Sequence, residues 1–90
     1  MKRKRLLAQL EELAARLEIE IRRENLGKSR GGLCRVEDKL FILVNKGLSD
    51  ASAIELLSTE LSRFDTAQMY LLPEVRESLD KSIRKREMDE

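Results

Sequence analysis

The chain has 90 residues and a mass of 10.4 kDa, so it holds one small domain and leaves no room for a two-lobed enzyme. Hydrophobic residues make up 41% and charged residues 39%, enough for a small core with little to spare. Eighteen basic and seventeen acidic residues leave a net charge of +1, which favours neither nucleic acid nor a membrane surface. Histidine, the commonest general base and zinc ligand, is absent, so we expect a protein that is not an enzyme.

Cysteine usage and hydropathy predict the compartment. The single cysteine, Cys34, cannot form a disulfide within the chain, and the basic start leads into an amphipathic segment rather than a signal sequence. The longest apolar run, 40–44, is far shorter than the ~20 residues that a membrane span requires. We therefore expect a cytoplasmic protein of a bacterial type, with no membrane segment and no cofactor.

The first half of the chain predicts a helix followed by three strands. Apolar residues recur every three or four positions over 6–17, the spacing of an amphipathic helix. Strict alternation over 18–23 predicts a half-exposed strand. Three of the four glycines fall within 25–32, which indicates a mobile loop. The segments 33–36 and 39–45 then form a predicted hairpin.

The strand at 39–45 is apolar on both faces, with Phe41 and Leu43 on one face and three aliphatic residues on the other. We therefore expect it at the centre of the sheet, with the other two strands at the edges. A simple meander would instead place Arg35 and Glu37 in the middle. A central strand of this kind leaves a second sheet face to be covered by a helix or by another subunit.

Two further helices complete the predicted domain. Ser49 is placed to cap a core helix that runs to about Phe64. Pro73 fits the first turn of a last helix, with apolar residues at four-residue spacing up to Ile83. The sequence predicts an α+β domain over 1–83 with the order helix, strand, β-hairpin, helix, helix. The remaining segment, 84–90, has little to bury and is expected to be a disordered charged tail.

Two local motifs invite a chemical interpretation, and neither supports one. The run 27–29, Gly-Lys-Ser, lacks the glycine that a phosphate-binding loop needs five positions earlier, where Arg22 stands. It also leads into a strand rather than a helix, so we interpret the segment from Gly27 to Gly32 as a flexible linker. Cys34 shares its strand face with Val36 and is interpreted as a small buried hydrophobe. A catalytic cysteine would need a lysine or carboxylate as its base.

Both ends of the chain are basic, at Lys2 to Arg5 and at 84–86, and either cluster could contact phosphate. Nucleic-acid binding surfaces often add aromatic residues for stacking, but the only aromatics here are Phe41, Phe64 and Tyr70. We therefore expect solvated charged ends, with nucleic-acid contact as the alternative.

Four consecutive large apolar residues at 69–72 cannot all face one core from one short segment. The strip either covers the end of the sheet or forms an exposed docking surface, and both uses stay open. Together with the outer face of the central strand, it supplies the candidate partner contacts. These residues are Phe41, Leu43, Met69, Tyr70, Leu71 and Leu72.

The segment 48–63, Leu-Ser-Asp-Ala-Ser-Ala-Ile-Glu-Leu-Leu-Ser-Thr-Glu-Leu-Ser-Arg, resembles the active-site helix of the ImmA/IrrE-type zinc metallopeptidases. The order of helix, strand, hairpin and capped helix is also similar over about the first two thirds of the chain. The two histidines of the family's His-Glu-x-x-His motif would fall on Thr59 and Arg63, and only Glu60 has a counterpart. The resemblance therefore implies a minimal relative that kept the scaffold and lost the peptidase. Glu60 itself is expected to be an ordinary glutamate that faces solvent on its helix.

The function that the sequence favours is a non-enzymatic interaction module that contacts a protein partner or a second copy as a homodimer. The alternative is a nucleic-acid-associated protein that uses the basic ends. A degenerate hydrolase centred on Glu60 is the third hypothesis. No metal or cofactor residues are predicted.

Overall fold

The computed structural model describes residues 2–89 and contains three helices and three strands in that range. In chain order these are α1 (Lys2–Arg16), β1 (Ile19–Glu24), β2 (Gly31–Val36), β3 (Lys39–Asn45), α2 (Asp50–Leu61) and α3 (Pro73–Asp89). The fold is α+β, with a helix, a three-stranded mixed sheet and two helices, as the sequence predicts. Within the described range, no helix has both the length and the apolar character needed to cross a bilayer.

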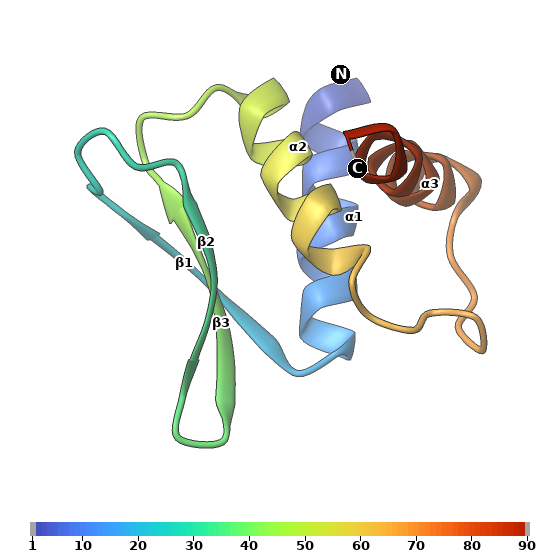
Figure 1. The fold of residues 1–90 in the computed structure, drawn as a ribbon, viewed down its shortest axis with the longest axis horizontal. Helices are drawn as coiled ribbons and strands as arrows, with labels where there is room; N and C mark the ends of the chain where they lie inside the picture. Colours follow the sequence, from blue (N-terminus) through green and yellow to red (C-terminus); the bar gives the residue numbers. More distant parts are fainter. Residues whose placement is uncertain (1, 90) are drawn as a thin grey trace.

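The sheet has the order β1-β3-β2, so the prediction of a central β3 is confirmed and the meander is wrong. Strand β3 runs parallel to β1 and antiparallel to β2. The β2–β3 hairpin turns at residues 37–38, where Glu37 has a left-handed backbone with φ of 57°. Because β1 and β3 are parallel neighbours, the chain passes through β2 before it returns to the middle of the sheet (Figure 1).

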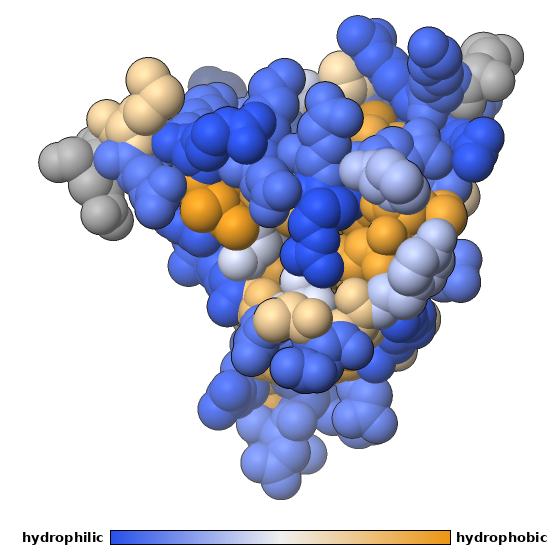
Figure 2. Space-filling model, turned by 90° about the vertical axis from the view of Figure 1, so that its right-hand side faces the viewer, coloured by the Kyte–Doolittle hydropathy of each residue, from blue (hydrophilic) through white to orange (hydrophobic). Residues whose placement is uncertain are grey.

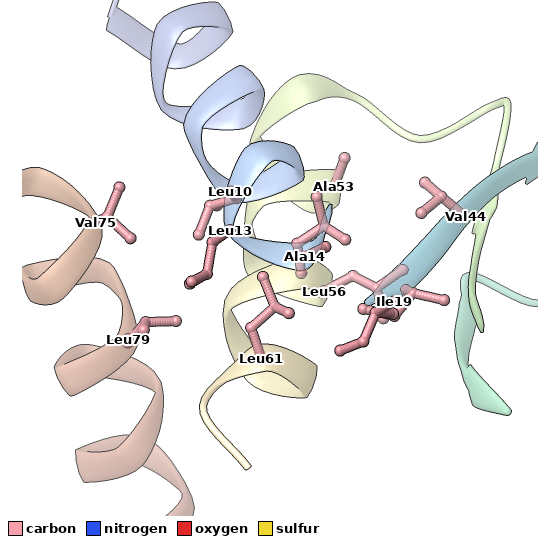
Figure 3. Packing of buried hydrophobic residues seen from close by; sticks show 12 residues of the cluster. Leu10, Leu13, Ala14, Ile19, Val44, Ala53, Leu56, Leu61, Val75 and Leu79 are labelled. Atoms are coloured by element: carbon pink, nitrogen blue, oxygen red, sulfur yellow. The ribbon is translucent and has the colours of Figure 1, made fainter. Parts of the chain in front are cut away.

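All three helices lie on one side of the sheet (Figure 1). Helices α1 and α2 form the layer next to the sheet, and α3 packs on their far side. Ile19 and Val44 approach the helices from the sheet, whereas Val75 and Leu79 approach them from α3 (Figure 3). One apolar cluster therefore joins the layers. Its buried members are Leu10, Leu13, Ala14, Ile19, Ile42, Val44, Ala53, Leu56, Leu57, Leu61, Val75 and Leu79.

Helix α2 begins as predicted and ends earlier than predicted. The Ser49 hydroxyl accepts a hydrogen bond from the backbone N–H of Ser52, which satisfies one free donor of the first turn. The helix stops at Leu61 rather than near Phe64. At this end the Ser62 hydroxyl donates to the carbonyl oxygen of Thr59, and residues 62–64 form a turn.

The charged ends are more ordered than the sequence suggests. Lys2 to Arg5 form the first turn of α1. The tail expected at 84–90 instead continues α3 as far as Asp89, and Glu90 lies outside the described residues. Contacts with α2 and with the residue after it support this part of α3, because Lys85 Nζ lies 3.4 Å from Glu55 Oε1 and Arg86 donates to the hydroxyl of Ser62.

Replacing Gly31 with alanine should strongly destabilise the β2–β3 pair. Gly31 has a φ of 114°, and an added Cβ would overlap the backbone carbonyl oxygen of Leu43. We expect a loss of about 2–4 kcal/mol in the free energy of unfolding, measured by urea denaturation. Gly47→Ala is the control, because its new Cβ would meet nothing closer than Asn45 Oδ1 at 3.6 Å. Equal stability of the two variants would contradict this structure of the hairpin.

Candidate interaction surfaces

On the outer face of the sheet, which points away from the helices, a charged side chain covers Phe41. Arg22 of β1 places its guanidinium carbon 4.3 Å from the centre of the Phe41 ring. Arg22 Nε donates to Glu20 Oε2 over 2.5 Å, and this hydrogen bond raises the pKa of Arg22, so the stacked group stays charged. Phe41 is only 7% exposed. A partner could reach its ring only by displacing Arg22.

The rest of this outer face is partly open. Leu43 is half-buried, and Cys34, which lies opposite Phe41 in the strand register, is half-buried rather than buried as expected. Val36 is exposed at the end of β2. Cys34 and Val36 sit on an edge strand whose outer face no described helix covers, which accounts for the difference.

The strip at 69–72 divides between core and surface. Met69 and Leu71 are partly buried and pack against the core, whereas Tyr70 is 76% exposed and Leu72 is 37% exposed. Core packing and exposure, the two uses that the sequence left open, therefore alternate along the strip. Tyr70 and Leu72 are the members of the strip that a partner could contact.

Tyr70 and Leu72 border a cavity of about 260 Å³ between α1 and the start of α3, here called the Tyr70 groove. Arg16 Nη1 donates to the carbonyl oxygen of Tyr70 over 3.0 Å and so fixes the strip against α1. The side-chain oxygen of Gln9 is shielded from water and has no hydrogen-bond partner among residues 2–89. The groove is lined by Gln9, Glu12, Leu13, Arg16, Tyr70, Leu71, Leu72 and Val75.

The six predicted contact residues do not form one site. Phe41 and Leu43 lie on the sheet, whereas the strip belongs to the connection between α2 and α3 on the other side of the helical layer (Figure 1). Figure 2 shows that other side of the molecule, where hydrophobic patches emerge between largely hydrophilic side chains. The exposed apolar groups of the strip therefore belong to the helical side of the molecule.

Glu60 has a structural position rather than the solvent-facing one that the sequence suggested. It is 9% exposed, and its Oε2 accepts a hydrogen bond of 2.7 Å from the backbone N–H of Leu33 on edge strand β2. Its Oε1 lies 3.0 Å from Arg63 Nε. Both carboxylate oxygens are thus engaged, and the side chain ties α2 to the sheet edge. A signal was present in the spacing, because Glu60 follows the buried Leu57 by three residues.

The positions that would hold zinc in the peptidase motif do not share one helix. Thr59 lies within α2, whereas Arg63 lies beyond the helix end. Within the described part of the chain, no group of three or more His, Cys, Asp or Glu side chains is placed to hold a metal ion.

The loop between β1 and β2, predicted to be mobile, is held by a side chain from the end of β3. Asn45 Nδ2 donates to the carbonyl oxygens of Gly27 and Ser29, over 2.9 and 2.7 Å. The loop leads into strand β2 and not into the helix that would follow a phosphate-binding loop, as the sequence predicts. The loop borders a shallow cavity of about 570 Å³, and Lys28 and Lys46 are among the residues that line it.

The two basic ends are partly neutralised by acidic residues of neighbouring helices. Arg5 Nε lies 3.1 Å from Glu74 Oε1, and Lys85 Nζ approaches Glu55. These exposed pairs reduce the charge that either end presents to a phosphate backbone.

Comparison of the chain with protein-family models, curated proteins and solved structures finds no match.

Replacing Glu60 with alanine should cost stability because it leaves the Leu33 N–H without its partner. We expect a loss of about 1–3 kcal/mol in the free energy of unfolding, the usual range for losing a hydrogen bond to a charged group. Glu60→Gln keeps an acceptor oxygen and should lose less. The control is Glu87→Ala, which removes an exposed carboxylate of α3 that forms no ion pair with another described residue. If Glu60→Ala were as stable as this control in urea denaturation, the structural role of Glu60 would be refuted.

Proposed function

We propose that the chain is a non-enzymatic protein–protein interaction module and that the Tyr70 groove is its contact surface. The observation that carries this proposal is the large exposed fraction of Tyr70, 76%, beside a cavity that the partly exposed Leu72 also borders. Tyrosine combines a large apolar ring with a hydroxyl donor, and it is enriched at the centres of protein interfaces. The strip is also held in place, since Met69 and Leu71 pack against the core and Arg16 binds the Tyr70 carbonyl. A surface held in this way needs little ordering when it binds.

The lining of the groove favours a particular kind of partner segment. Leu13 and Val75 are buried at its base, which suits an apolar side chain inserted between Tyr70 and Leu72. Gln9 Oε1 has no donor among the described residues, so an N–H of a partner that reaches this oxygen would satisfy it. We therefore propose a partner protein that presents an apolar side chain next to an N–H donor.

Two features support contact rather than catalysis. The one carboxylate that the peptidase resemblance places in a motif, Glu60, already holds Leu33 and Arg63. A general acid or base has to reach its substrate, and a carboxylate with both oxygens occupied inside the fold is poorly placed to do so. The chain also contains no histidine.

Replacing Tyr70 with glutamate should release a partner without unfolding the protein. A charge at this position would lie in the apolar contact, whereas an exposed residue of the free protein tolerates substitution within about 0.5 kcal/mol. The measurement is affinity capture from cells with the tagged full chain, followed by titration of the recovered partner against each variant. Met88→Glu is the matched control, because Met88 is 85% exposed and lies outside the groove.

We expect the partner to bind wild type and Met88→Glu alike and to bind Tyr70→Glu at least about tenfold more weakly. Leu72→Glu should show the same loss. Equal binding by Tyr70→Glu and wild type would overturn the proposal. Failure to recover any partner whose binding depends on Tyr70 would also count against it.

A further inference from the structure

A second and larger groove, of about 540 Å³, runs along α3 between this helix, α2 and the first turns of α1. We call it the α3 groove. Ser58 of α2 and Ser78 of α3 meet within it, with their hydroxyl oxygens 2.5 Å apart. Leu6 and Ile54 supply partly buried apolar surface. The face of α3 that lines the groove consists of Glu74, Glu77, Ser78, Lys81, Ser82 and Lys85.

The charges on this face of α3 are segregated by sign along the helix. Both glutamates lie in its first half, and both lysines lie in its second half. Glu74 pairs with Arg5, and Lys85 pairs with Glu55, inside the chain. Glu77 and Lys81, one helical turn apart at the middle of the face, are exposed and form no ion pair with another described residue. The face therefore carries one free charge of each sign.

This charge pattern is complementary to the same pattern on a second helix that runs in the opposite direction. In an antiparallel pair of α3 helices, the acidic half of each copy lies opposite the basic half of the other. Glu77 of each copy then faces Lys81 of the other, so the same ion pair occurs twice about a two-fold axis. Ser78 and Ser82 have small side chains near that axis, which allows the two helices to approach closely.

We infer that the α3 groove is a self-association surface, whose occupant is α3 of a second copy of this chain in antiparallel orientation. The second copy covers the apolar surface of Leu6 and Ile54, and the Glu77–Lys81 pairs set its orientation. This inference is independent of the Tyr70 groove, which shares no lining residue with the α3 groove.

Charge reversal tests the inference by sedimentation velocity of the full chain over a concentration series up to about 1 mM at low salt. Wild type is expected to form dimers. Glu77→Lys and Lys81→Glu should each weaken self-association about tenfold or more, because each creates two like-charge contacts per dimer. An equimolar mixture of the two variants should regain it, since the unlike copies again bring opposite charges together.

The matched controls are Glu87→Lys and Lys39→Glu, which reverse exposed charges outside the groove and should leave self-association unchanged. Recovery in the mixture requires both variants to be folded, so loss of structure cannot imitate it. A monomeric wild type overturns the inference, and so does a mixture that associates no better than its separate components. Tyr70→Glu should dimerise like wild type, and a loss of dimers in that variant would likewise overturn the inference.

Discussion

The pairing of β3 with both of its neighbours is the interaction on which the rest of the structure depends. On the inner face, Ile42 and Val44 are buried beneath α1 and α2, and full burial of one such side chain stabilises a fold by about 1.5–3 kcal/mol. On the outer face, Phe41 is closed over by Arg22 of β1. One chain therefore covers Ile42 and Val44 on one face of the central strand and Phe41 on the other. For this reason, we propose that recognition takes place on the helical side rather than on the sheet.

Helix α2 connects the sheet to the elements that form the two grooves. Glu60 joins this helix to edge strand β2 through the Leu33 N–H, and Ser58 joins it to α3 through Ser78. The strip at 69–72 connects the same two helices, so its packing sets where Tyr70 emerges. Contacts on either side of α2 thus determine the shape of surfaces that lie far from the sheet.

Local sequence signals predicted the elements of the fold well. The alternation of β3 identified the central strand, while Ser49 and Pro73 marked the starts of α2 and α3. Contacts between distant segments could not be predicted in the same way. Near the end of α3, Lys85 lies beside Glu55, which is thirty residues earlier in the chain. Composition alone suggested a disordered tail there.

The candidate site was predictable only in part. The strip at 69–72 was visible as a run of apolar residues, but its division into buried and exposed members depends on where α1 lies. The cover over Phe41 depends on the register between β1 and β3, which no pattern within either strand determines. The signs of Glu77 and Lys81 could be read in the sequence, but only the packing of α3 shows that both side chains line an open groove.

Hydrogen exchange of the β3 amides in a dilute, monomeric sample tests most directly whether one chain completes its own sheet. We predict that these amides are already among the slowest to exchange in the dilute, monomeric sample. Fast exchange in the monomer, slowed only when copies or partners associate, would contradict it. That result would show that one chain does not complete its own sheet.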